Sequence, residues 1–109
     1  MSAYVISEVE FIDIVAFDSY RTLAAASIAE YGGKYLVRGA VPVVAEGDRN
    51  NRTIVVVEFD SMERIQEWYH SKAYAAALIY REKALRRRLL FVDGLIALLG
   101  KYNTIFGQD

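Results

Sequence analysis

Two glutamates lie within stretches that are mostly apolar, and carboxyl groups in such a setting are candidates for acid–base chemistry. Glu8 lies in AYVISEVEF (residues 3–11) and Glu58 in TIVVVEF (residues 53–59). Apolar surroundings and a neighbouring carboxylate raise the pKa of a carboxyl group towards the range in which it can donate and accept protons. If the two segments are adjacent strands, Glu8 and Glu58 share a sheet face, and we take them as catalytic candidates. In the alternative reading, each pairs with an arginine or lies at a wet rim of the sheet.

Arg38 is the candidate anchor for an anionic substrate. It precedes Gly39, where the missing side chain lets a ligand or a neighbouring backbone come close. A guanidinium can hold a carboxylate through two parallel hydrogen bonds, or it can neutralise Glu58 within the fold. The second role is purely structural and would make the segment EYGGKYLVRG (residues 30–39) chiefly a turn.

Three aromatic residues surround a predicted break between two helical segments. They are Trp68, Tyr69 and Tyr74, and such side chains either fill the core or form the wall of a pocket. Core packing is favoured for Trp68. The hydroxyl groups of Tyr69 and Tyr74 need partners if they are buried, so these two are the better candidates for donating hydrogen bonds to a substrate.

The residue inventory gives no support for a bound metal or cofactor. The chain has one histidine, His70, and no cysteine, whereas metal and haem sites usually take several such ligands. The glycines of GGKYLVRG (residues 32–39) follow a predicted helix and precede a strand, which is the reverse of a dinucleotide-binding fingerprint. We therefore expect no metal and no tightly bound cofactor.

The first half of the chain predicts a strand, a helix and a second strand. Residues 3–11 are rich in β-branched and aromatic side chains. A helical period follows from Asp13, a suitable N-cap, to Tyr31, and its apolar stripe contains Ile14, Phe17, Ala24, Ile28 and Tyr31. Gly32 and Gly33 offer the left-handed conformation that ends helices, and residues 34–39 resume as a strand.

The second half predicts two strands with a broken helix between them. Residues 40–52 form a long turn, and 53–59 a strand. Asp60, with Glu63 three residues later, has the pattern of a capping box, while Ser71 is suited to cap a continuation after a kink. Residues 86–94 predict the last strand. The resulting β-α-β-β-α-β order is typical of an α+β, ferredoxin-like antiparallel sheet with its helices on one face.

The strands are apolar on both faces, although helices can cover only one. In residues 53–59, Val55, Val57 and Phe59 point to one side, and Ile54, Val56 and Glu58 point to the other. Leaving that surface in water would cost several kcal/mol at about 25 cal/mol per Å². The sequence therefore predicts a homodimer whose sheets pack face to face.

Length and charge exclude several other classes of protein. The 109 residues suit one compact domain. A formal net charge of -1 gives no general attraction for nucleic acid or anionic lipid. The start of the chain lacks the pattern of a signal peptide, and no apolar run is long enough to span a membrane. We expect a cytoplasmic protein without a nucleic-acid or membrane partner.

Several ordered motifs resemble the domain-of-unknown-function 1330 family, within the dimeric α/β-barrel superfamily. They are AYVISEVEF, YGGKYLVRG, EGDRNNR leading into VVVEF, and WYHSKAY followed by Arg81. The resemblance implies a ferredoxin-like protomer and a dimer enclosing a barrel-like cleft, but no particular reaction. Arg49, Asn50 and Asn51 depart from the aromatic and proline residues common at this turn, so a role of the turn in closing the cleft does not carry over.

We divide the chain into a domain over residues 1–94 and an extension over 95–109 that packs on the dimer or on a neighbouring subunit. The leading functional expectation is a cofactor-independent enzyme that acts on a small, anionic organic molecule between sheet and helices. A non-catalytic ligand-binding or regulatory module is the alternative, and a purely structural assembly unit is a third reading.

Overall fold

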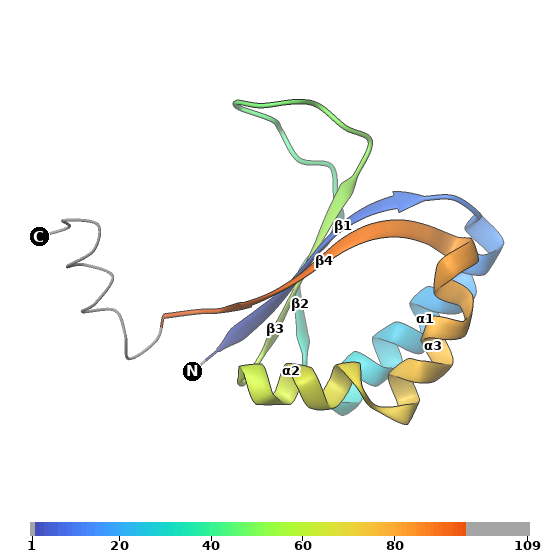
Figure 1. The fold of residues 1–109 in the computed structure, drawn as a ribbon, viewed down its shortest axis with the longest axis vertical. Helices are drawn as coiled ribbons and strands as arrows, with labels where there is room; N and C mark the ends of the chain where they lie inside the picture. The colour runs from blue at the N-terminus through green and yellow to red at the C-terminus, as the bar shows by residue number, and fades with distance from the viewer. Residues whose placement is uncertain (1, 96–109) are drawn as a thin grey trace, which may run out of the picture.

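The computed structural model describes residues 2–95, which form one antiparallel sheet with its helices on one side (Figure 1). The strands are β1 (Ala3–Phe11), β2 (Lys34–Ala40), β3 (Thr53–Phe59) and β4 (Leu85–Asp93), in the order β2-β3-β1-β4. The helices are α1 (Ile14–Glu30), α2 (Met62–Tyr69) and α3 (Lys72–Ala84). The α+β, ferredoxin-like class predicted from the sequence is confirmed.

Local signals explain where helix α1 begins and ends. The Asp13 carboxylate accepts hydrogen bonds from the backbone amides of Val15 and Ala16, at 2.9 and 3.0 Å. At the other end, Gly32 has a φ of +79°, as the sequence predicted for a helix C-terminus. Gly33 serves another purpose, because a Cβ there would lie 2.6 Å from an Ile28 methyl carbon and 2.8 Å from the Phe59 ring. It allows the start of β2 to pack closely against the core.

Two details of the helices differ from the sequence prediction. Ser61, not Asp60, caps α2, since its hydroxyl accepts from the amide of Arg64 at 3.1 Å. Ile14 does not belong to the buried side of α1 and is 82% exposed, whereas Tyr20 and Ser27 are buried there. The break after Tyr69 is as predicted, with Ser71 capping α3.

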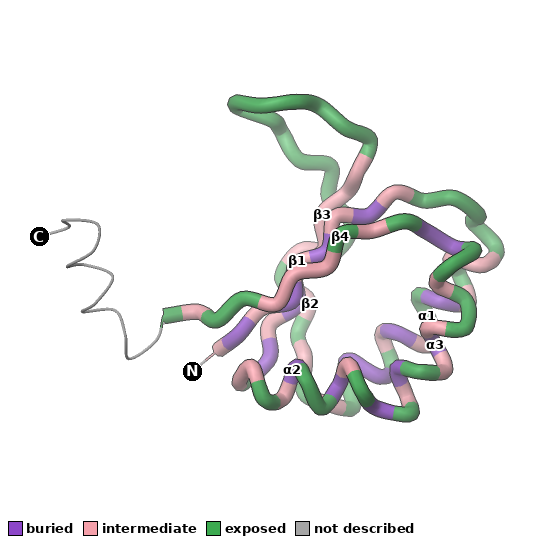
Figure 2. The backbone as a smooth tube through the Cα atoms, viewed as in Figure 1, coloured by how far each residue is buried: buried purple, intermediate pink, exposed green. Residues whose placement is uncertain are grey.

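The core lies between the helices and the side chains at odd-numbered positions of β1 (Figure 2). Val5 and Val9 are buried there, with Val57 and Phe59 from β3. The opposite surface, which we call the open face, carries the even-numbered positions of β1 and their cross-strand partners. Its apolar members are Tyr4, Ile6, Ile54, Val56, Leu90 and Val92.

The register of β2 is interrupted twice, and the interruption decides where Arg38 points. Tyr35 pairs with Val57, but Val37 pairs with Val56 and Arg38 with Val55. The extra residue in β2 is a β-bulge, which moves the following side chains to the other sheet face. Without the bulge Arg38 would lie on the open face, whereas with it Arg38 lies on the face that the helices cover.

Beyond β2, the hairpin of residues 41–52 projects from the sheet and is exposed except at Arg52 (Figure 2). None of the described helices combines the length and apolar character needed to cross a membrane. The predicted extension over 95–109 falls, except for its first residue, outside the described part of the chain.

Candidate functional site

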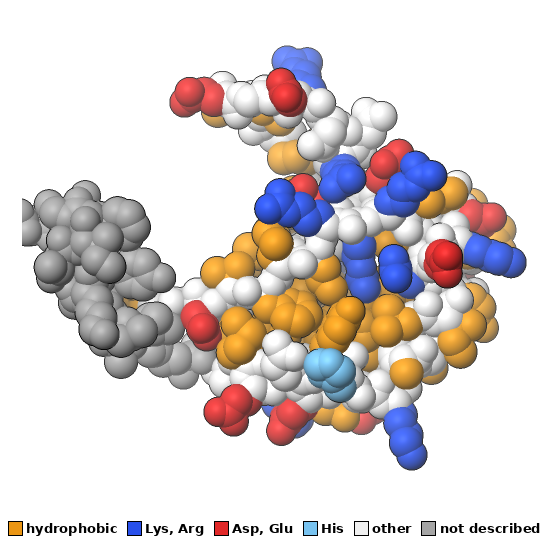
Figure 3. Space-filling model, viewed as in Figure 1, with side chains coloured by type: hydrophobic (Ala, Val, Ile, Leu, Met, Phe, Trp, Pro, Cys, Tyr) orange, Lys and Arg blue, Asp and Glu red, His pale blue; other side chains and the backbone are white. Residues whose placement is uncertain are grey.

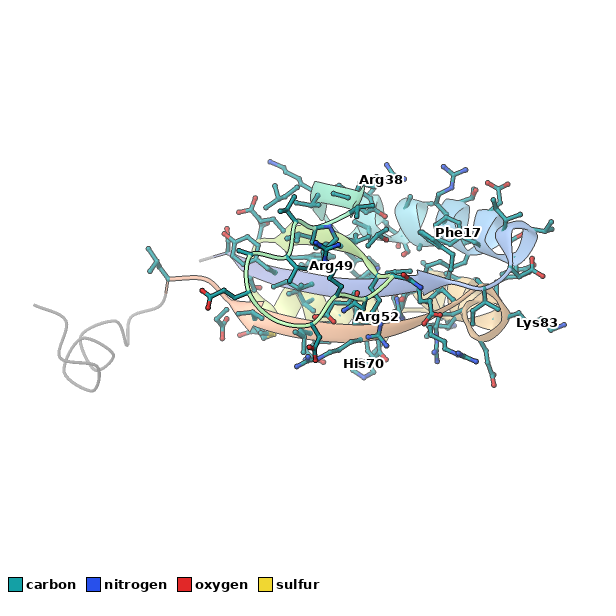
Figure 4. The ribbon with its side chains drawn as sticks, turned by 90° about the horizontal axis from the view of Figure 1, so that it is seen from above. Phe17, Arg38, Arg49, Arg52, His70 and Lys83 are labelled. Atoms are coloured by element: carbon teal, nitrogen blue, oxygen red, sulfur yellow. The ribbon has the colours of Figure 1, made fainter. Side chains whose placement is uncertain are left out.

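A cavity of about 390 Å³ lies between the sheet and helix α1. This volume lies in the range of small-molecule sites. Most of its wall is apolar, and the polar side chains that line it are Ser7, Tyr20, Arg21, Tyr35, Arg38 and Arg87. The face drawn in Figure 3 carries His70 and shows Lys and Arg side chains beside hydrophobic ones between the sheet and helix α3. Arg38 lies on the opposite side of the molecule (Figure 4).

One side of the cavity is open to solvent. Among the lining residues, Phe11, Arg21, Arg38 and Gly39 are exposed, so these residues form the mouth. Arg21 is already engaged, because its guanidinium pairs with Asp18 at 2.6 Å. Arg38 has no carboxylate within ion-pair distance in residues 2–95, and its guanidinium lies 4.2 Å from the centre of the Tyr35 ring. Arg38 is therefore the cation at the mouth that is available to an anion.

Deeper in the cavity, Arg87 is held by two phenols. Its two terminal nitrogens donate to the hydroxyls of Tyr20 and Tyr74, each at 2.7 Å, and these hydroxyls are themselves 2.7 Å apart. We call these three residues the phenol–arginine triangle. Burial opposes the charge on Arg87, but the two phenols offset this and hold the pKa of its guanidinium above its ordinary value. The guanidinium of Arg87 thus keeps its positive charge at the inner end of the cavity.

Burial also keeps two phenols of this region neutral. It raises the pKa of Tyr74 well above the usual value, and the neighbouring Tyr20 adds to that effect while Arg87 opposes it. Burial raises the pKa of Tyr35 as well, against the influence of Arg38. Neutral phenols can donate hydrogen bonds, which ionised ones cannot.

The floor of the cavity carries Ser7 on β1, one of the two inner strands of the sheet. This residue is 5% exposed, and no described residue forms a hydrogen bond with its hydroxyl. Cross-strand pairing places Ser7 between Val55 of β3 and Leu89 of β4. Val55 in turn pairs with Arg38 of β2. Ser7 on the floor and Arg38 at the mouth therefore lie in the same row of cross-strand partners.

The remaining predicted binding residues divide between wall and core. Trp68 reaches the cavity, yet it is also buried and donates its indole N–H to the Ser27 hydroxyl at 3.0 Å. Tyr74 is fully buried and does not line the cavity. Its hydroxyl forms hydrogen bonds with Tyr20 and Arg87, which do line it. Tyr69 packs edge-on against Phe91 and does not line the cavity.

Glu8 and Glu58 lie on the open face, not in this cavity. Glu58 pairs with Tyr4, and Glu8 with Ile54, which confirms that the carboxylates share a sheet face. Four residues of strand separate them, roughly 13 Å at 3.3 Å per residue, so they cannot share a proton. Glu8 instead lies 3.8 Å from the Arg52 guanidinium, in an ion pair of the kind the alternative reading described.

His70 is remote from the cavity. Its ring nitrogen Nδ1 lies 2.9 Å from the carbonyl of Gln66 at the end of α2, and the view from above places it on the opposite side of the molecule from Arg38 and Phe17 (Figure 4). Within residues 2–95, no three acidic or histidine side chains converge in a way that could hold a metal ion.

Four antiparallel strands in the order β2-β3-β1-β4 beneath packed helices define a ferredoxin-like protein with a cavity between its layers. The chain belongs to the family described as a domain of unknown function, DUF1330, whose model matches residues 2–95. The comparison with curated protein sequences found no match. The family predicted from the sequence is thus confirmed.

Solved structures resemble this fold at low sequence identity. A protein of unknown function from Rhodopseudomonas palustris, RPA0582, is 17% identical with a TM-score of 0.73, over 87% of this chain and 83% of that one. SnoaB, a cofactor-independent oxygenase from Streptomyces nogalater, is 10% identical with a TM-score of 0.63, over 89% and 96%. A dimeric ferredoxin-like protein of unknown function from Bacteroides fragilis is 13% identical with a TM-score of 0.56, over 85% and 96%. These identities support a shared fold only.

Proposed function

We propose that the chain binds a small organic anion with an apolar body in the cavity between sheet and helices. The observation that carries this proposal is the charge of the lining. Three arginines line the cavity, while none of the described lining residues is Asp, Glu or His. Arg21 pairs with Asp18, but Arg38 and Arg87 have no carboxylate partner among the described residues. Such cations favour an anionic ligand, and the apolar wall favours one with a hydrocarbon or aromatic body.

Arg38 is the proposed anchor for the anionic group. It lies at the mouth, where a carboxylate keeps part of its hydration and so loses little solvation energy on binding. Its guanidinium rests on the Tyr35 ring, which restricts the side chain before the ligand arrives.

Replacing Arg38 with Gln tests this role. With 4-phenylbutanoate as the probe, we expect the affinity measured by calorimetry to fall about 10- to 100-fold, because a charge-assisted hydrogen bond contributes about 1.5–3 kcal/mol. Arg49→Gln is the matched control, since it removes the same charge from the exposed hairpin (Figure 4). Equal losses in the two variants, or no loss in Arg38→Gln, would overturn the assignment.

The second candidate function is an enzyme that stabilises negative charge on a ligand oxygen without a bound cofactor. The phenol–arginine triangle favours it, because fixed donors aimed at a developing oxyanion accelerate reactions. The fold is also that of a cofactor-independent oxygenase. Mass spectrometry of compounds that raise the melting temperature separates the candidates: chemically altered compounds indicate an enzyme, and unaltered ones a binding module.

We also propose that the chain forms a homodimer through the open face. Tyr4, Ile6, Val56 and Leu90 give that face an apolar centre without a covering layer in the described chain. One of the similar structures is of a dimeric protein.

A further inference from the structure

We infer that the ligand of this cavity carries a second oxygen, which accepts hydrogen bonds from Ser7 and Tyr20 while its anionic group lies at Arg38. The ligand class is therefore an organic acid with a keto or other acceptor oxygen within its apolar body. This inference rests on the proposed binding of an organic anion and adds the functional group that the floor of the cavity selects.

The first observation is the hydroxyl of Ser7. A buried hydroxyl without a partner destabilises the folded state, because its bonds to water are lost and not replaced. Ser7 lies on an inner strand and lines the cavity, where an alanine would avoid that cost. A ligand oxygen above the floor supplies the missing partner.

The second observation comes from counting protons in the phenol–arginine triangle. The two phenols carry one O–H each, and their mutual bond uses only one of them, while Arg87 donates to both oxygens. One phenol proton is therefore left without an acceptor among the described residues. Tyr20 lines the cavity and Tyr74 does not, so Tyr74 donating to Tyr20 leaves the remaining proton facing the ligand.

The third observation is the relative position of these groups. Arg87 occupies the position diagonal to Ser7 on the neighbouring strand, roughly 7–8 Å away between backbones, and Tyr20 is bonded to Arg87. Arg38 lies in the row of Ser7 but two strands away, roughly 9–10 Å between backbones. The donors Ser7 and Tyr20 lie at one end of the proposed ligand site and Arg38 at the other, with the apolar wall between them.

The test compares two acids with the same skeleton, 4-oxo-4-phenylbutanoate and 4-phenylbutanoate, together with their methyl esters. Calorimetry on the full chain should show that the oxo acid binds about three- to tenfold more tightly than the plain acid, as one or two neutral hydrogen bonds allow. Each of Ser7→Ala and Tyr20→Phe removes one of the two donors, so each should show a smaller preference for the oxo acid than the wild type.

Thr53→Val is the matched control for Ser7→Ala. The Thr53 hydroxyl is also buried without a hydrogen-bond partner, but Thr53 does not line the cavity. Removing either hydroxyl should raise the melting temperature of the free protein by a few degrees. Only Ser7→Ala should also reduce the preference for the oxo acid, which separates a ligand contact from a merely structural effect.

The possible failures are distinguishable. Acids that bind no better than their methyl esters would overturn the proposed function itself. Acids that bind better than the esters, but without a preference for the oxo acid in the wild type, would overturn only the present inference. A preference that keeps its full wild-type size in either Ser7→Ala or Tyr20→Phe would overturn it as well.

Discussion

At the scale of single residues, the phenol–arginine triangle concentrates the chemistry of this molecule. Within residues 2–95, the Arg87 guanidinium forms hydrogen bonds only with the hydroxyl oxygens of Tyr20 and Tyr74, and Tyr74 is held neutral by burial. A charge kept in an apolar cavity without a counterion interacts more strongly with an incoming anion than it would in water. In the proposed function, the anionic or acceptor group of the ligand is the partner for this charge.

The raised pKa of Tyr74 predicts a loss of stability in alkali. In the unfolded chain a tyrosine ionises near pH 10, whereas burial keeps Tyr74 protonated in the fold. Its contribution to the free energy of unfolding is fully present below about pH 10 and is lost as the pH rises towards the folded-state pKa, because only the unfolded state releases the proton.

Tyr74→Phe should therefore reduce the dependence of stability on pH above about pH 10. Urea unfolding at several pH values should show the slope become shallower by up to about 1.4 kcal/mol per pH unit, the effect of one proton. Tyr80→Phe, which removes an exposed hydroxyl on the same helix, is the control and should keep the wild-type slope. Identical slopes for all three proteins would contradict the role of burial at Tyr74.

Arg38 and Tyr74 were predicted from the sequence as binding residues, but Arg87 and Ser7, which line the cavity, were not. Arg87 lies in the run REKALRRR, where adjacent arginines look alike, and only strand alternation turns Arg87 inward while Arg86 and Arg88 are exposed. Ser7 separates Ile6 and Glu8 in a strand and gives no sign of its own. Ser7 could have been placed on the buried face because it alternates with Val5 and Val9, which are apolar and lie on the same side of the strand.

At the scale of elements, the ends of helices were predictable to within one residue, and strand irregularities were not. Asp13 and Ser71 were recognised as caps because each precedes a clear change of pattern. At the start of α2 two capping residues stand side by side, and backbone geometry selects Ser61 over Asp60. The bulge in β2 depends on pairing with β3, a contact between distant residues that local sequence does not encode.

The choice between the two caps can be measured. Ser61→Ala should lower the free energy of unfolding by about 1 kcal/mol, because the amide of Arg64 loses the hydroxyl that accepts its hydrogen bond. Asp60→Ala, one residue earlier and exposed, should change it by less than about half that amount. Chemical denaturation of both variants gives the comparison, and the reverse order would show that Asp60 is the effective cap.

At the scale of the whole molecule, the two faces of the sheet differ in what covers them and in where their charges lie. The helix-covered face holds the cavity, and the open face carries an apolar centre with charged residues towards one end, where Glu8 and Glu10 pair across strands with Arg88 and Arg86. That the strands are apolar in both directions was evident from the sequence. The sequence did not show which face of the sheet Glu8 and Glu58 occupy. That depends on whether the odd- or the even-numbered residues of β1 face the helices.

The proposed homodimer predicts that a charge at the centre of the open face separates the protomers. Val56 lies beside Ile6 in the register of β1 and β3, and an aspartate there would be buried without a partner in a face-to-face dimer. Light scattering should give twice the 12.3 kDa chain mass for the wild type and the single-chain mass for Val56→Asp.

Ile79→Asp is the matched control, since Ile79 is 77% exposed on α3, away from the open face, and should leave the dimer intact. Circular dichroism confirms that each variant is folded before its mass is compared. A monomeric wild type at micromolar concentration, or a folded Val56→Asp that remains dimeric, would show that the open face does not join two copies.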